Sequence, residues 1–146
     1  MSASVGRGLL IAAAVVIVAA SATAVVKMGG PGAQRQMRLD ERRVQDLSRI
    51  DQELRGYFDA HKALPPDLAK LAAQPGLALT IRDPDTTAPY AYQPGQNGRF
   101  RLCTRFATDT AQEPTQMRDP MQLGEKQWRH PAGDHCYERD ASADKS

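Results

Sequence analysis

A single apolar run near the N-terminus most constrains how this chain can fold. Residues Leu9 to Val26 form 18 consecutive positions without a charge, and the chain after Lys27 is largely polar. A membrane-spanning helix needs about 20 apolar residues, and the long side chains of Arg7 and Lys27 can reach the interface at either end. The run therefore predicts an N-terminal transmembrane helix, with residues 1–28 as the anchor.

Two other interpretations of the run remain open. A cleaved signal peptide would have its apolar core from Leu9 to Ala20, followed by small-residue cleavage sites at residues 20–22 or 22–24. Only Arg7 and the amino terminus are positive before the run, which is weak for a signal peptide and favours the anchor. A buried core helix is less favoured still, because the run has no polar face.

The orientation of the anchor is predicted differently by its flanks and by the cysteines. Only Arg7 precedes the run, whereas five basic residues follow it: Lys27, Arg35, Arg38, Arg42 and Arg43. By the positive-inside rule this bias keeps the C-terminal part in the cytoplasm. The two cysteines, Cys103 and Cys136, instead suggest a disulfide in an exported domain. We follow the cysteines and expect a single-pass protein of the bacterial inner membrane with its C-terminal domain in the periplasm.

The rest of the chain has the size and charge of one small, neutral domain. About 114 residues follow Gly32, and they contain all 17 acidic residues and 17 of the 19 basic ones. A nucleic-acid surface needs a basic excess, so this balance argues against nucleic acid as a partner. Large aromatic residues are few, so a disulfide between Cys103 and Cys136 would help by about 3–4 kcal/mol in the chain-entropy model.

A long amphipathic helix is predicted over residues 36–61, after a Gly/Pro linker at 29–35. Its apolar positions recur at helical spacing: Leu39, Val44, Leu47, Ile50, Leu54, Tyr57 and Phe58. Opposite charges four residues apart line the other side, and they indicate a solvated face: Arg42 with Asp46, Arg49 with Glu53, and Asp51 with Arg55.

Short elements follow this helix. Pro65 ends it, and a second helix is expected at 67–74, then a short strand or extended segment at 77–81 and a turn at 83–87. Strands are predicted at 90–92 and 100–106, joined by a hairpin loop at 94–98. In the second strand one face is apolar, with Phe100, Leu102, Thr104 and Phe106, and the other carries Arg99, Arg101, Cys103 and Arg105.

The C-terminal part is predicted to be less regular. Residues 108–125 have no clear period and indicate a long loop, after which Trp128 is expected to dock on the sheet. Cys103 points away from the main core, toward this segment, where Cys136 can meet it. The domain is expected to extend over residues 36–137, followed by a disordered tail at 138–146.

This order of elements resembles that of type IV pilins and of the major pseudopilins of type II secretion, over roughly residues 42–106. The matching motifs are Asp46-Leu47, Ile50, Leu54, Tyr57, Leu64-Pro65, Leu68, Leu71, Asp83-Pro84 and Pro89-Tyr90-Ala91-Tyr92. The resemblance implies an α+β fold in which an N-terminal helix crosses the membrane and a small antiparallel sheet packs on the long helix. The prepilin processing motif of that family is a glycine followed by an aromatic-rich start that has a glutamate at its fifth residue. The segment around Gly6-Arg7-Gly8 has no such motif.

Candidate chemistry is sparse. Cys103 and Cys136 lack the Cys-x-x-Cys spacing of a redox pair, so a structural disulfide is favoured over redox chemistry or a metal site. The alternative metal ligands are Cys136 with His61, His130 and His135, and the alternative acid–base or calcium ligands are Asp83, Asp85 and Asp134. The histidines are more typical of a surface, and Asp83-Pro84-Asp85 is more typical of a turn. We therefore expect no catalytic residue, no metal, no cofactor and no small-molecule substrate.

Two functions remain from this reasoning. The first is a membrane-anchored, non-catalytic envelope protein that is a structural or assembly component of a secretion or pilus-like system. The alternative is a single-pass accessory subunit or binding module of another membrane complex. In that case the small residues of the apolar run would allow close helix packing: Ala12, Ala13, Ala19, Ala20 and Ser21. Both functions imply the membrane and a protein as partners.

Overall fold

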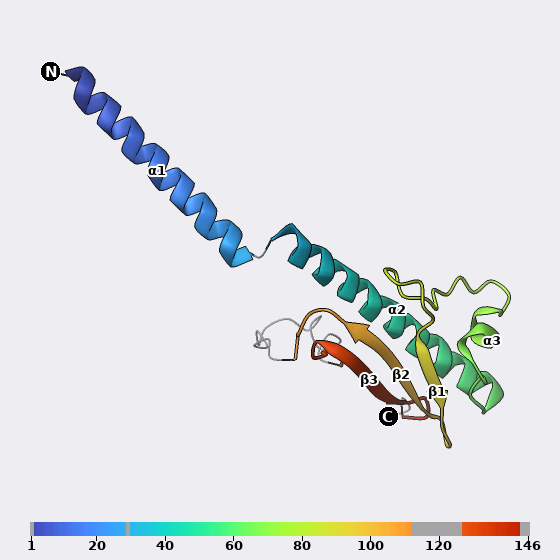
Figure 1. Cartoon of the computed structure of the whole chain (residues 1–146). Coiled ribbons are helices and arrows are strands. Elements are labelled where there is room, and N and C mark those ends of the chain that lie inside the picture. The colour runs from blue at the N-terminus through green and yellow to red at the C-terminus, as the bar shows by residue number, and fades with distance from the viewer. Residues whose placement is uncertain (1, 29, 112–126, 144–146) are drawn as a thin grey trace. The chain divides into compact units, whose positions relative to one another are not determined.

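The chain is an α+β protein in which an apolar N-terminal helix precedes a long helix and a small antiparallel sheet. The computed structural model describes residues 2–28, 30–111 and 127–143. Its elements are α1 (Ser2–Met28), α2 (Pro31–His61), α3 (Leu68–Ala72), β1 (Ala91–Pro94), β2 (Arg99–Phe106) and β3 (Gly133–Asp140) (Figure 1). The chain divides into two compact units, residues 1–35 and 36–146.

Helix α1 is apolar on every side. Its segment Gly6–Ala24, 19 residues, is long and apolar enough to cross a membrane by length and composition. The side chains of this segment are exposed along almost its whole length. Among the described residues this helix has no polar side, and an exposed apolar segment of this kind fits either a membrane span or a signal sequence.

Helix α2 begins earlier than the sequence predicts. It starts at Pro31, and the carbonyl oxygen of Gly30 accepts hydrogen bonds from the amides of Ala33 and Gln34 at 3.0 and 3.3 Å. Proline suits the first helical turn, where its missing amide costs nothing. The predicted linker at 29–35 is therefore wrong from Pro31 onward. The first buried side chain of α2 is that of Leu39, eight residues after the helix begins.

The segment after α2 is compact but forms no strand. Asp67 caps α3 by accepting a hydrogen bond from the amide of Lys70 at 2.7 Å. The predicted extended segment at 77–81 is not part of the sheet, and only an isolated bridge between Arg82 and Pro89 follows it. The hydroxyl group of Tyr92 donates to the carbonyl oxygen of Pro65, which holds β1 against the loop between α2 and α3.

The sheet has the order β1-β2-β3, and both pairs are antiparallel. Leu102 faces Tyr92 on one side and Tyr137 on the other. Strand β3 continues to Asp140, and Ala141 is buried, so the tail predicted to be disordered from residue 138 is ordered at least to Ala141. Most of the predicted loop at 108–125 lies outside the described residues.

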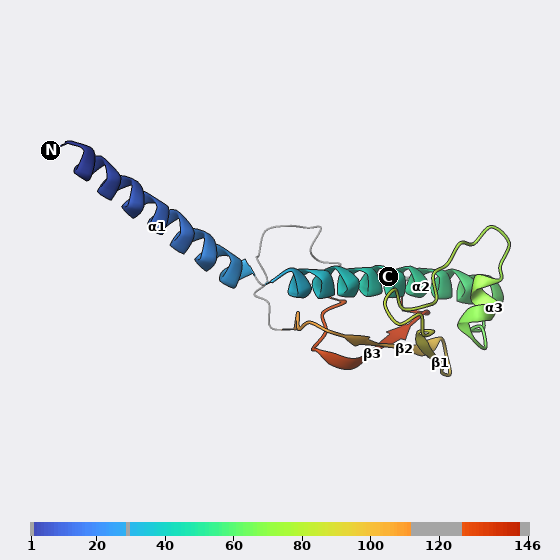
Figure 2. The same ribbon diagram turned by 45° about the horizontal axis from the view of Figure 1, so that its top comes forward.

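The core lies between one side of α2 and one face of the sheet, as Figures 1 and 2 show. Its fully buried members come from both layers: Leu47, Ile50 and Leu54 from α2, with Phe100, Leu102 and Phe106 from β2. Each such side chain contributes roughly 1.5–3 kcal/mol by leaving water. Trp128 is also part of this core and packs edge-on against Tyr137. The hydroxyl group of Tyr137 donates to the Trp128 carbonyl oxygen at 2.7 Å. This is the docking predicted for Trp128.

Candidate functional site

The outer face of the sheet carries the cysteine pair. Cys103 of β2 and Cys136 of β3 are opposite one another in the register and form a disulfide, with 2.07 Å between the sulfur atoms. Cys103 lies on the same side of β2 as Arg99, Arg101 and Arg105, as the alternation predicts, and both cysteines are partly exposed. The bond joins strands that are separated by a long connection, and it therefore suits a structural cross-link.

Charged residues surround the disulfide on this outer face. The facing pairs across β2 and β3 are Arg99 with Asp140, Arg101 with Glu138, Cys103 with Cys136 and Arg105 with Asp134. Arg101 Nε lies 3.6 Å from Glu138 Oε1, and both side chains are half exposed or more. Opposite charges directly across an antiparallel pair stabilise it modestly. The hairpin end of this face forms an open hollow of about 680 Å³ with mainly polar and charged walls.

A second, buried ionic cluster lies on the other side of the sheet. Arg43 of α2 donates through Nε to Asp83 Oδ2 at 2.5 Å and through Nη1 to Asp40 Oδ1 at 2.7 Å. Asp40 also accepts from the amides of Ala107 and Thr108 and from the Thr108 hydroxyl group. The three charged residues are at most 8% exposed. The cluster therefore ties α2 to the end of β2 and to the turn at 83–87.

The electrostatics of this cluster keep its members ionised. Burial alone would raise the pKa of Asp83, but hydrogen bonds from Arg43 and from the amides of Thr86 and Asp85 outweigh burial and hold the pKa well below its usual value. The pKa of Asp40 is also lowered, because its hydrogen bonds from Thr108, Arg43 and Ala107 outweigh burial. The hydrogen bond to Asp83 raises the pKa of Arg43 still further. Charges held in this way have a structural role and are poorly placed to exchange protons near neutral pH.

Tyr90 provides a further link between α2 and the start of the sheet. Its hydroxyl group donates to Asp46 Oδ2 at 2.9 Å. Burial raises the pKa of Asp46, and the negative charge of Asp83 raises it further. Burial and the hydrogen bond to Asp46 raise the pKa of Tyr90 as well. This contact places the Pro89-Tyr90 motif against the Asp46-Leu47 motif of α2.

A groove of about 520 Å³ lies beside the buried cluster. Strand β1 pairs with β2 only as far as Cys103, so in the described chain residues 104–106 pair with β3 alone and leave space next to the 83–91 segment. Asp83, Asp85 and Asp134 all line this groove. Among the described residues, however, no group of three histidine, cysteine or acidic side chains is arranged to hold a metal ion. Asp83 is occupied by Arg43 and the turn, as the turn interpretation predicts.

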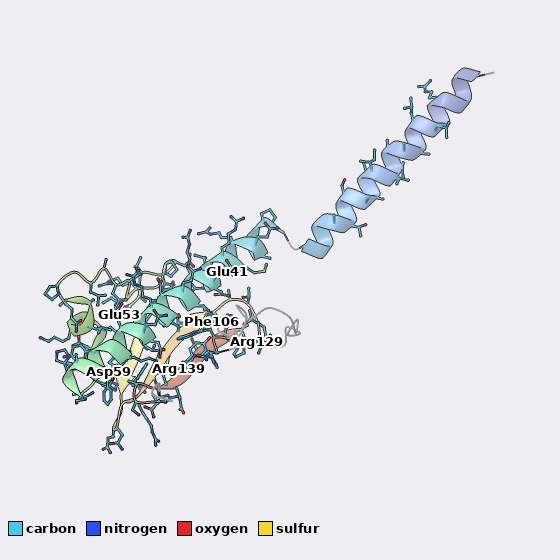
Figure 3. The ribbon with its side chains drawn as sticks, turned by 180° about the vertical axis from the view of Figure 1, so that it is seen from behind. Glu41, Glu53, Asp59, Phe106, Arg129 and Arg139 are labelled. Carbon is cyan, nitrogen blue, oxygen red and sulfur yellow. A yellow bond between two sulfur atoms is a disulfide. The ribbon has the colours of Figure 1, made fainter. Side chains whose placement is uncertain are left out.

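The three histidines lie in different surroundings. His61 stacks on Tyr57 at the exposed end of α2, with 4.1 Å between ring centroids. His130 is buried and stacks on Phe106, which is labelled in Figure 3, with 3.6 Å between the ring centroids. Its prediction as a surface group is therefore wrong. His135 contacts Tyr137, and burial together with the charge of His130 lowers its pKa.

The buried cluster is not predicted from the sequence. Arg43 is one of the five basic residues that follow the apolar run, and Asp40 is not among the residues expected in the core. A signal was present, because Asp40, Arg43, Leu47 and Ile50 follow each other at steps of three, four and three, which is the spacing of the buried stripe. Charged residues at core positions of a helix indicate partners elsewhere in the chain.

Comparison of the chain with protein-family models, with curated proteins and with solved structures finds no match.

Proposed function

We propose that this chain is a membrane-anchored, non-catalytic envelope protein with a pilin-like or pseudopilin-like domain, and that it serves as a structural or assembly component of a secretion or pilus-like system. One observation carries the proposal: an apolar helix long enough to span a membrane precedes a long helix that packs a small antiparallel sheet through one stripe. The pilin motifs support it, because Tyr90 of Pro-Tyr-x-Tyr contacts Asp46 of α2. On this proposal the protein has one span in the bacterial inner membrane and its domain in the periplasm, where the disulfide forms.

Crosslinking in native membranes tests the proposal. An amine- or photo-reactive crosslinker should capture the full chain with copies of itself or with envelope assembly proteins. The disulfide provides the matched control for location, since thiol labelling of intact cells should find Cys103 and Cys136 oxidised. A protein that stays monomeric and without partners, with free thiols, would contradict both the assembly role and the export.

The alternative, an accessory subunit that docks through its anchor, is favoured by the exposed small residues of α1. The side chains of Ala12, Ala13, Ala19 and Ala20 are all exposed in the structure. If they pack on a partner helix, replacing them with leucine should release the protein from its complex, whereas Val15→Leu and Val16→Leu should not. Unchanged co-purification after the alanine replacements would rule this alternative out.

A further inference from the structure

An exposed row of arginines lies on the half of α2 that follows the anchor. We propose that this row binds the headgroups of anionic phospholipids in the membrane that α1 spans, an inference that rests on the membrane anchorage proposed above. The row, here called the arginine face, consists of Arg38 and Arg42, and Arg49 lies on the same side of the helix further along the chain. These three residues are four and seven positions apart, which places them within an arc of about 40° around the helix.

The arginine face points away from the domain core. All three arginine side chains on this side of α2 are exposed, whereas Leu47, Ile50 and Leu54 on the opposite side are fully buried. Figure 3 shows nitrogen-bearing side chains on the early turns of α2 that project away from the strands. Arg43 does not belong to this face, because Asp40 and Asp83 hold it in the core.

The charge of this face is poorly balanced close to the anchor. From Lys27 to Leu39 the chain carries three basic residues and no acidic one. Asp40 comes next, but it is buried and is already bound by Arg43 and Thr108. Glu41 is exposed one turn after Arg38, and Asp46 lies one turn after Arg42, where it accepts a hydrogen bond from Tyr90. Arg35, Arg38 and Arg42 still outnumber these two carboxylates. A positive surface therefore remains exposed on these turns.

Chain length keeps this surface near the membrane, and this limits which partner can occupy it. The five steps from Val26 to Pro31 span at most about 17 Å, and the helical turns to Arg38 add about 10 Å, whatever the angle between α1 and α2. Arg38 therefore lies no more than about 27 Å from Val26, so α2 can bring it to the headgroups without leaving the anchor. Arg49 lies about 17 Å further along the helix, beyond the screening length of roughly 8–10 Å from Arg38.

The experiment uses the full chain in lipid nanodiscs made from equal amounts of phosphatidylcholine and phosphatidylglycerol. Native mass spectrometry then counts the lipids that stay bound when the protein is released. We expect a preference for phosphatidylglycerol, and we expect it to fall about five-fold for each charge removed in Arg38→Gln and Arg42→Gln. Arg49→Gln is the matched control, with the same change on the same side of α2 but outside the arginine face and further along the helix from the anchor, and its preference should stay within about two-fold of wild type.

The lysine variants separate charge from other effects. Arg38→Lys with Arg42→Lys keeps the charge and should keep the preference, which a purely structural role of the arginines would not predict. Equal retention of the two lipids by the wild-type chain would overturn the inference while leaving the anchorage intact, and it is also the outcome if the face binds a protein instead. A chain that fails to enter nanodiscs would overturn the anchorage and this inference with it.

Discussion

The domain contains arginine–carboxylate pairs in two contrasting environments. On the inner side Arg43 is enclosed with Asp40 and Asp83, and each carboxylate also accepts backbone hydrogen bonds. On the outer face Arg101 lies 3.6 Å from Glu138 in contact with solvent. The same chemistry therefore has different consequences. Removing one partner of a buried pair leaves an uncompensated charge in the core, whereas water replaces the partner in an exposed pair.

The largest effect is expected for the buried cluster. Arg43→Ala leaves Asp40 and Asp83 facing each other without a cation, and it should lower the free energy of unfolding by about 3–5 kcal/mol. Denaturant unfolding of the full chain in detergent, followed by the fluorescence of the single tryptophan, Trp128, measures this loss. Arg42→Ala, one residue away and exposed, is the control and should change stability by less than about 0.5 kcal/mol. Similar losses for the two variants would remove the contrast between the environments.

The disulfide should contribute the most on the outer face. It closes a loop with a sequence separation of 33 residues, and replacing both Cys103 and Cys136 with serine should cost about 3–4 kcal/mol. The same unfolding assay, repeated on the wild-type chain under reducing conditions, should give a matching loss. If the reduced and oxidised proteins have the same free energy of unfolding, the pairing of β2 with β3 holds the C-terminal strand in place without the disulfide.

Acid should act on the buried cluster in a defined direction. The pKa values of Asp40 and Asp83 are lowered in the folded state, so their contribution is complete above the unfolded value of 3.8 and is lost as the pH falls below it toward the folded values. The wild-type chain should therefore lose stability steadily as the pH falls from about 4 to about 2. Asp83→Asn should be less stable at neutral pH and should show a shallower acid slope. If Asp83→Asn loses stability with falling pH as steeply as the wild-type chain, other carboxylates cause the loss of stability in acid.

The parts of this fold that the sequence predicts depend on local periodicity. The apolar run, the stripe through Leu47, Ile50 and Leu54, and the alternation of β2 each repeat within a few residues. Such patterns report directly on which side of an element meets the core. The hairpin loop is also local: Asn97 and Gly98 both have positive φ, and a side chain at Gly98 would lie 3.1 Å from the ring of Phe58.

The features that the sequence does not predict depend on distant partners. Strand β3 places His135 and Arg139 on its inner side, and polar residues there hide the strand from a search for apolar alternation. The structure compensates with Trp128, because the guanidinium group of Arg139 lies 4.3 Å from its ring (Figure 3 labels Arg139). In the same way Arg43 reaches across 40 residues to Asp83. No sequence pattern within a few residues of Arg43 predicts Asp83 as its partner.

The smallest effect is expected for the exposed pair, and it gives the sharpest test of the comparison. Arg101→Ala should cost less than about 1 kcal/mol, because water solvates Glu138 as soon as its partner is removed. A double-mutant cycle of Arg101→Ala with Glu138→Ala should give a coupling energy of roughly 0.2–1 kcal/mol that shrinks in high salt. The parallel cycle of Arg43→Ala with Asp83→Ala should give a larger coupling that salt hardly changes, because the pair lies out of reach of the solvent ions. Equal salt dependence in the two cycles would mean that the buried cluster opens to water.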